Sequence, residues 1–269
     1  RSIVKAARQG IEDWCAGQTL EGLKLSCDLI EGMRKSNTLR SADAGRASRR
    51  PIPVSVKTRI GYDEVVVDDW IQTLLEEKPV AISIHGRTLK QGYKGNADWD
   101  AIGRAVEVAK ASDTLILGNG DLKDMGDIYR RVRASGVDGV LLGRAAQGNP
   151  WIFRAKHRLK RALDSVDSLP IQSQPVDLDE RFRVIVEHAQ HFENYVQIRN
   201  FVGMRKHLIW YCRDFSGAAE LRAKMARANN TAQVIQCLRE FRHGPNGQAV
   251  APPILRHDGQ RSEATTAAF

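Results

Sequence analysis

The sequence lacks the features that would mark a membrane-spanning or secreted protein. No apolar run in the 269 residues approaches the roughly 18 residues that a membrane-spanning helix needs. The chain begins at Arg1, and no charged segment followed by an apolar core indicates a secretion signal. The missing initiator methionine suggests that an upstream segment is absent. We therefore expect a protein that does not insert into membranes.

Cysteine is scarce and irregularly spaced. The four cysteines, Cys15, Cys27, Cys212 and Cys237, form no C-x-x-C pair and match no zinc-binding pattern. We expect reduced thiols, a cytoplasmic location and no bound metal. Cys27 falls on an apolar helical face with Leu23 and Ile30, which predicts a place in the core.

Charge is abundant, and it is unbalanced. Hydrophobic residues make up 42% of the chain and charged residues 27%, which is the composition of a globular protein. The 41 lysines and arginines outnumber the 32 acids, giving a net charge of +9. Such an excess suggests a polyanionic partner, nucleic acid before an anionic membrane.

Short apolar strands alternate with amphipathic helices in the first part of the chain. The predicted strands are 53–59, 81–87, 114–121 and 137–144, and the predicted helices are 19–35, 68–78, 97–112, 124–135 and 149–163. Alternation of this kind predicts βαβ units and a parallel sheet. The polar, Arg-rich segment 36–50 is predicted to be an exposed loop.

From residue 164 onward the pattern no longer alternates between strands and helices. Residues 164–178 contain two prolines and are predicted to be a linker. Residues 179–243 are helical in pattern throughout and predict an all-α domain, and residues 244–269 are expected to be a disordered tail.

Polar side chains alternate with aliphatic ones on the first two predicted strands. One face of each strand ends in cations: Ser55, Lys57 and Arg59 on the first, and Ser83, His85 and Arg87 on the second. Cations at the carboxyl ends of consecutive strands are typical of the active face of a βα-barrel. The alternative is that these side chains simply reach solvent.

The next two strands end in glycine-bearing loops. Gly118, Asn119, Gly120 and Asp121 follow one strand, and Gly143 and Arg144 follow the other. Glycines let backbone N–H groups approach an anion closely, and an arginine beside them completes a phosphate site.

These motifs resemble a known family. The segments VSVKTRIGYDE (54–64), HGRTLKQGYKGNADWDAI (85–102), GNGD (118–121) and GVLLGRAAQGNPWIF (139–153) are similar to the tRNA-dihydrouridine synthases, and RNFVGMRKHLIWY (199–211) is similar to that family's C-terminal helical domain. The resemblance implies an FMN enzyme on a TIM barrel, which reduces the 5,6 double bond of selected uridines in tRNA with NADPH as electron donor.

The resemblance also implies roles for individual residues. The cofactor-binding residues would be Lys57, His85, Asn119, Gly120, Asp121, Gly143 and Arg144, with Lys57 as a fixed cation beside the flavin. Arg59 and Arg87 become candidates for contact with the uridine or its neighbouring phosphates. The excess of cations at 199–242, rather than the resemblance, adds Arg199, Arg205 and Lys206 as candidates for contact with the tRNA substrate.

The family's proton donor is a cysteine in an Asn-x-Gly-Cys-Pro loop, which this sequence does not contain. In the family a segment resembling residues 1–10 follows that loop, so the acid is expected upstream of Arg1, and Cys15 is a weak substitute. Because only four strands are visible where a barrel has eight, we expect the C-terminal half of a TIM barrel. The expected layout is a partial barrel at 1–163, a linker at 164–178, a helical tRNA-binding domain at 179–243 and a tail at 244–269.

Two alternatives stay open on sequence alone. One is an FMN barrel oxidoreductase for a small molecule, such as a relative of dihydroorotate dehydrogenase, and the other is a non-catalytic RNA-binding remnant. Nine cations against three acids at 199–242, with Trp210 and Tyr211 nearby, favour an RNA partner. The full-length protein is expected to be a monomer, and this fragment is expected to be inactive.

Overall fold

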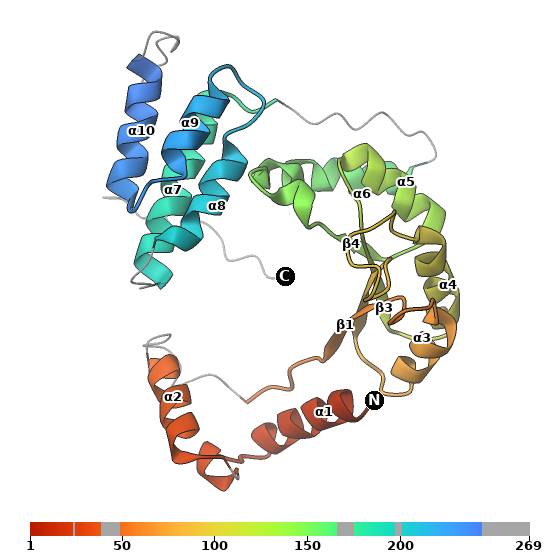
Figure 1. Cartoon of the computed structure of the whole chain (residues 1–269). Coiled ribbons are helices and arrows are strands. Elements are labelled where there is room, and N and C mark those ends of the chain that lie inside the picture. The colour runs from red at the N-terminus through yellow and green to blue at the C-terminus, as the bar shows by residue number, and fades with distance from the viewer. Residues whose placement is uncertain (24, 39–48, 166–174, 197–200, 244–269) are drawn as a thin grey trace. The chain divides into compact units, whose positions relative to one another are not determined.

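The computed structural model describes residues 1–23, 25–38, 49–165, 175–196 and 201–243 (Figure 1). Arg199, the tail at 244–269, most of the predicted linker and most of the Arg-rich loop lie outside the described residues. Two compact units make up the chain: Arg1–Arg144 with Leu159–Pro170, and Ala145–Arg158 with Ile171–Phe269. Each unit is described by itself below.

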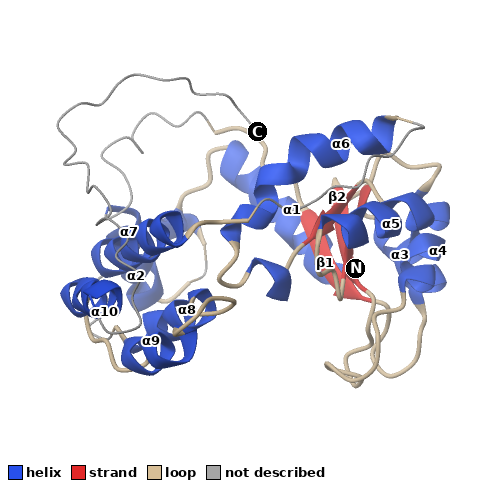
Figure 2. Cartoon of the chain, turned by 90° about the horizontal axis from the view of Figure 1, so that it is seen from above, coloured by secondary structure: helices blue, strands red, loops and turns tan. Residues whose placement is uncertain are grey.

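The first unit is built on a four-stranded parallel sheet (Figure 2). Its strands are β1 (Ser55–Arg59), β2 (Ala81–His85), β3 (Leu115–Asn119) and β4 (Gly139–Leu141), in the order β1-β2-β3-β4. The parallel α/β prediction is therefore confirmed. β1 ends at the predicted residue, Arg59, whereas β2, β3 and β4 end two or three residues earlier than predicted, because their polar carboxyl ends leave the ladder and form the following loops.

Three helices connect the strands and cover one face of the sheet. They are α3 (Val67–Leu75), α4 (Trp99–Ala109) and α5 (Met125–Ser135). Ile82, Ile84 and Ile116 of the sheet are buried under them, each at 1% exposure or less. Full burial of such a side chain stabilises the fold by about 1.5–3 kcal/mol. The helix boundaries are set locally: the side chain of Asp98 caps α4 by accepting from the Ala101 N–H, and Gly136 ends α5 with a φ of 71°.

The opposite face of the sheet carries the alternate residues and is more open. Ser55 and Lys57 are exposed, and Leu115 keeps 51% of its surface accessible. Within the described residues, β1 and β4 each pair on one side only.

The N-terminal segment departs from the prediction. It forms α1 (Ser2–Cys15), a 3-10 turn at Leu20–Gly22 and α2 (Cys27–Thr38), rather than one helix over 19–35. Leu23, Leu25 and Ser26 are not helical, and the Leu29 N–H donates to the Ser26 side chain at 3.4 Å, as at a helix start. Cys27 is consequently the first residue of α2 and is exposed, so the prediction that it lies in the core is wrong.

The second unit is all helical. It contains the 3-10 segment Pro150–Ala155, the start of α6 (Lys156–Asp164), and then α7 (Leu178–Val196), α8 (Val202–Tyr211), α9 (Ala218–Met225) and α10 (Thr231–His243). Its core includes five side chains at 1% exposure or less: Phe182, Ile185, Met204, Leu208 and Leu221.

Residues 145–158 group with this helical unit, although the sequence places them in the barrel domain. The reason is packing. Trp151 belongs to the core of the bundle and meets Tyr211 edge-on at 6.2 Å. Gly148 has a φ of 64° and lies so close to Trp210 that an added Cβ would meet the Trp210 carbonyl oxygen at 2.1 Å.

The described part of the chain shows neither a membrane-spanning helix nor a cluster of metal ligands. No helix there combines the length and apolar character needed to cross a membrane. No group of three or more His, Cys, Asp or Glu residues in the same part could hold a metal ion.

Candidate active site

The register of the sheet places the predicted site residues in two adjacent rows. Arg59, His85, Asn119 and Leu141 are aligned across the four strands at their carboxyl edge. Two residues earlier, Lys57 is aligned with Ser83, Leu117 and Gly139 on the same face of the sheet. Parallel pairing thus gathers Lys57, Arg59 and His85 at one edge, although they come from two separate strands.

His85 shows the electrostatic character of this edge. Burial, together with the positive charges of Arg59, Lys57 and Arg87, lowers its pKa to about 4, and the negative charge of Asp121 opposes this shift only in part. The imidazole is therefore uncharged at neutral pH. The three cations that contribute to this shift, rather than the burial, favour an anionic ligand at the same edge.

Arg59 and Lys57, the cations of the two rows, differ in whether their side chains have hydrogen-bond partners. Nη1 of Arg59 donates to the Thr88 carbonyl oxygen at 3.0 Å, so its guanidinium is fixed to the loop after β2. Lys57 is exposed, and among the described residues it has no hydrogen-bond or ion-pair partner. Lys57 is thus the cation that remains available to a ligand.

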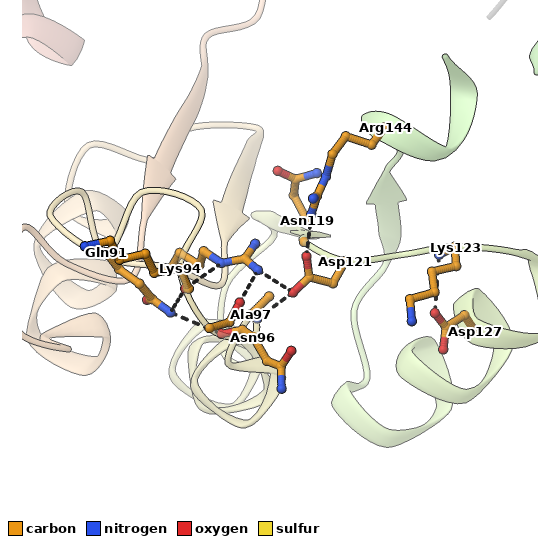
Figure 3. Close-up of polar contacts among 12 residues, drawn as sticks. Gln91, Lys94, Asn96, Ala97, Asn119, Asp121, Lys123, Asp127 and Arg144 are labelled. Carbon is orange, nitrogen blue, oxygen red and sulfur yellow. Dashed lines mark hydrogen bonds and ion pairs between the residues drawn. The ribbon is translucent and has the colours of Figure 1, made fainter. Parts of the chain in front are cut away.

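Asp121 connects the loops that follow β2, β3 and β4 (Figure 3). Its Oδ2 accepts from Ala97 N and from Arg87 Nη2, both at 2.7 Å, and its Oδ1 accepts from Arg144 Nη2 at 2.6 Å. Burial opposes ionisation of this carboxyl, but the Ala97 and Arg87 hydrogen bonds and the two guanidinium charges outweigh it, and its pKa is lowered. Asp121 has a φ of 51°, an uncommon conformation that these bonds hold in place.

Arg87 is enclosed by the chain rather than presented to solvent. It is 3% exposed, and besides Asp121 it donates to the carbonyl oxygens of Gly95 at 2.6 Å and Lys94 at 3.4 Å. Its Nη1 is buried and has no hydrogen-bond partner in the part of the chain that is described. This placement favours a role in holding the 94–97 loop, with one donor left over, rather than the direct contact with tRNA that the resemblance suggests.

The sequence analysis did not identify the residues that pack against the glycine-bearing loop at 118–121. The Trp99 ring lies against Gly118, where an added Cβ would meet it at 2.5 Å, and its Nε1 donates to the Gly120 carbonyl oxygen at 3.0 Å. Gly120 has a φ of 136°, and an added Cβ would meet Ala97 at 2.5 Å. The available signal was the pair of glycines themselves, since glycine in a strand often marks a close approach by another group.

The remaining loop residues leave room at the same edge. The Asn119 side chain donates to the Leu141 carbonyl oxygen at 2.8 Å and so joins β3 to β4. At Gly143 an added Cβ would meet nothing within 4 Å. The Arg144 side chain is 62% exposed, and its guanidinium lies 5.8 Å from the centre of the Tyr93 ring.

The candidate tRNA-contact residues in the helical unit differ in their exposure and hydrogen bonding. Arg205 is half-buried and donates to the Ala228 carbonyl oxygen at 2.9 Å and to Asn229 Oδ1 at 2.6 Å. Lys206, the next residue on α8, is exposed. Arg199 lies outside the described residues, so its predicted role stays a prediction.

All four cysteines lie away from the strands and strand-end loops in sequence. Cys15 and Cys27 are on α1 and α2, Cys212 ends α8, and Cys237 is on α10. Cys212 is buried, which raises its pKa to about 12.

The fold and the strand-end residues together define the class as a parallel α/β protein with cations and glycine-bearing loops at the carboxyl edge of its sheet. Comparison with known proteins makes this specific. The family model described as "Dihydrouridine synthase (Dus)" matches residues 33–243, so the chain belongs to the dihydrouridine synthase family.

The relatives with curated names agree with the family. The chain is 31% identical over 185 residues to a probable tRNA-dihydrouridine synthase 1 of Synechocystis, covering 68% of this chain and 49% of that protein. It is 32% identical over 194 residues to a probable tRNA-dihydrouridine synthase of Mycobacterium tuberculosis (70% and 46%). It is also 32% identical over 194 residues to tRNA-dihydrouridine synthase B of Pseudomonas syringae (71% and 54%). The chain thus spans about half the length of these relatives.

Proposed function

We propose that this chain is the half of a tRNA-dihydrouridine synthase that holds the cofactor phosphate and part of the tRNA. When bound, FMN would supply the reducing chemistry, with NADPH as the source of electrons for the 5,6 double bond of uridine. The observation that carries the proposal is the alignment of Lys57, Arg59 and His85 at one sheet edge, beside the two glycine loops.

The residues present suit a phosphorylated cofactor. Backbone N–H groups of the 118–121 loop and of Gly143 are donors for phosphate oxygens, and the exposed guanidinium of Arg144 supplies charge. The orphaned Nη1 of Arg87 is a further buried donor in the same group of loops, and such an atom favours a partner that the chain itself does not provide. Asp121, as a carboxylate, repels phosphate, and its role is to hold Arg87 and Arg144.

Lys57 and His85 serve the other end of the site. Lys57 keeps a positive charge on the inner face of the sheet, where it stabilises negative charge that develops nearby. Uncharged His85 can donate one hydrogen bond and accept another, and so can orient a ring carbonyl or imide without adding charge. Arg59, fixed by Thr88, remains a candidate for the uridine or its neighbouring phosphates.

The 269-residue chain is proposed to be inactive by itself. Within the described residues the sheet has four strands with two unpaired edges, where the proposed barrel needs eight. The proton donor that the family resemblance implies, a cysteine in an Asn-x-Gly-Cys-Pro loop, is not in these 269 residues. Activity would then require the remaining strands and the acid from another segment.

A chimera tests the proposal. The part of the Pseudomonas syringae synthase that precedes its matched segment would be fused to residues 1–269, and purified chimera assayed with unmodified tRNA, FMN and NADPH. We expect dihydrouridine, detected by mass spectrometry of tRNA nucleosides, and none from the 269-residue chain alone.

Two results would contradict the proposal. A folded chimera that binds FMN but forms no dihydrouridine would remove the assigned activity. Robust turnover by the chain alone would show that a proton donor has been overlooked.

A further inference from the structure

Two tyrosines of the first unit keep their rings in water on the loops of the strand-end site. Tyr62 lies in the loop after β1 and is 61% exposed, and Tyr93 lies in the loop after β2 and is 78% exposed. A single exposed aromatic side chain is common on protein surfaces. Two of them on neighbouring loops, at the carboxyl edge of one sheet, suggest a shared role.

A cation lies over each of these rings. Lys90 Nζ is 5.5 Å from the centre of the Tyr62 ring, and the Arg144 guanidinium is 5.8 Å from the centre of the Tyr93 ring. Both distances are within the range of cation–π attraction. Because Arg144 also bonds Asp121, this contact joins the Tyr93 ring to the strand-end site itself.

Other ring–cation pairs in the described part of the chain have rings that are buried or half-buried. Trp99 is 4% exposed and Phe182 1%, and Tyr129 of α5 is half-buried with the Arg133 guanidinium 5.7 Å from its ring centre. In these pairs the cation lies against a ring that already packs within its own unit. Tyr62 and Tyr93 instead keep ring surface available to a molecule from outside the chain.

Main-chain hydrogen bonds join the two loops that carry the tyrosines. The Leu89 N–H donates to the Gly61 carbonyl oxygen at 3.0 Å, and the Lys90 N–H donates to the Tyr62 carbonyl oxygen at 2.8 Å. Lys90 Nζ also donates to Asp63 Oδ2 at 3.0 Å, so the cation over the Tyr62 ring is bonded to the same loop as the ring. The loops after β1 and β2 therefore form one connected surface.

The turn that carries Tyr93 is closed by the Gln91 side chain (Figure 3). Its Nε2 donates to the carbonyl oxygens of Lys94 at 2.9 Å and Asn96 at 3.2 Å, and its Oε1 accepts from the Thr88 N–H at 3.3 Å. A ring held on a closed turn loses little conformational freedom when a ligand binds. Tyr93 is thus exposed and also preorganised.

An exposed ring beside a positive charge suits an unpaired nucleotide. The ring offers a face on which a base can stack, and a nearby cation attracts the phosphate that follows it. An anionic lipid surface would use the charge without needing the ring. A peptide would use the ring without needing the charge. The combination therefore favours single-stranded nucleic acid over either.

We propose that Tyr62 and Tyr93 are stacking platforms for unpaired nucleotides on either side of the uridine that enters the strand-end site, with Lys90 beside them for the RNA backbone. The inference rests on the proposed function for the identity of the nucleic acid. A base that is turned out of its stack leaves its neighbours without a partner. An exposed ring at the entrance replaces that partner.

The test removes the rings without changing the charge of the chain. Tyr62→Leu, Tyr93→Leu and the double variant are made in the full 269-residue chain, together with Tyr62→Phe and Tyr93→Phe, which keep the ring. Tyr129→Leu is the matched control, because it removes a ring that also carries a cation but lies on α5. Circular dichroism checks that every variant folds like the parent chain.

Binding is measured with a single-stranded RNA of about 12 nucleotides that carries 2-aminopurine, and with a duplex of the same sequence. We expect each Tyr→Leu variant to bind the single strand about 5- to 150-fold more weakly, the usual effect of removing one stacking ring. The slope of log K against log salt should stay unchanged, because no charge is removed.

The controls separate stacking from a general loss of binding. Tyr62→Phe and Tyr93→Phe should bind like the parent chain and keep the quenching of 2-aminopurine fluorescence that stacking causes, which the leucine variants should lose. Affinity for the duplex should not change in any variant, since its bases are already stacked.

Several outcomes would overturn the proposal. These are unchanged single-strand affinity in the double variant, an equal loss in Tyr129→Leu, or no measurable binding of single-stranded RNA by the folded parent chain. A double variant that binds RNA normally but loses a self-association seen by sedimentation would assign the rings to a protein interface instead. The dihydrouridine assay uses a chimera in which both tyrosines are intact, so the two proposals fail separately.

Discussion

The two units of this chain use charge in opposite ways. At the edge of the sheet, Lys57, Arg59 and Arg87 surround an imidazole that they help to keep neutral, and a single carboxylate, Asp121, holds two guanidinium groups. In the helical unit most cations are matched one to one by acids or carbonyl oxygens. The first arrangement leaves positive charge in excess at the sheet edge, and the second neutralises it within the helical unit. We therefore expect a local excess of charge, rather than the number of cations, to mark a functional surface.

The largest expected effect comes from removing the side chain that packs against the glycine-bearing loop at 118–121. Trp99→Ala should destabilise the first unit by about 3–5 kcal/mol, because it leaves a cavity under Gly118 and an unpaired Gly120 carbonyl. Trp151→Ala is the matched control, since it empties a similar place in the second unit. Urea unfolding is followed by far-UV circular dichroism. Trp99→Ala should shift the unfolding transition of the first unit to lower urea, and Trp151→Ala should shift that of the second unit. A single transition displaced alike in both would mean that the two units unfold together.

The next effect concerns Lys57 in the active chimera. Lys57→Met should lower the rate of flavin reduction by NADPH about 10²–10³-fold, the usual cost of removing one charge-stabilising group from a site. Lys110→Met, on the outer helix α4 and paired with Glu107 at 3.3 Å, is the control and should leave the rate unchanged. Stopped-flow absorbance reports the step directly, and a wild-type rate for Lys57→Met would exclude Lys57 from the site.

A smaller effect is expected from acid. The folded pKa of His85 is about 4, below its ordinary value of 6.5. As the pH falls, the unfolded chain therefore takes up a proton at this histidine before the folded chain does. The free energy of unfolding consequently decreases between about pH 6.5 and 4, and this group has no effect on it above that window. His85→Gln should reduce the fall in urea midpoint between pH 7 and pH 5. His157→Gln, at an exposed position of α6, should not.

The smallest effect separates two neighbours on α8. Arg205→Gln should cost about 1 kcal/mol of stability, because it removes hydrogen bonds to Ala228 and Asn229. Lys206→Gln should leave the unfolding midpoint unchanged and flatten the salt dependence of tRNA binding by no more than about one contact. If Arg205→Gln weakened tRNA binding without affecting stability, Arg205 would be a phosphate ligand, as the excess of cations at 199–242 predicts.

The sequence was informative where a pattern repeats and poor where a single contact decides. Alternation of aliphatic and polar residues on two strands predicted the parallel sheet and the shared face of Lys57 and His85, because strand geometry alone determines it. The enclosure of Arg87 was not predictable, since it depends on how the 94–97 loop folds back over it. Cys27 was misplaced for a related reason: an apolar spacing of 3.6 does not say at which residue the helix begins.

The sequence also did not indicate that residues 145–158 group with the helical unit. Their composition fits the end of a βα unit, but Trp151 and Gly148 join the bundle through contacts with Tyr211 and Trp210, some 60 residues later in the chain. Local periodicity carries no information about a partner at that distance.

The contact between Trp99 and Gly118 has a consequence for how members of the family diverge. The helix residue and the strand residue share one volume, so neither can change in size independently of the other. The two positions are therefore expected to covary, a smaller side chain at 99 accompanying any larger one at 118. Across the family, the outer layer of the fold would in this way restrict the evolution of the loop that follows β3.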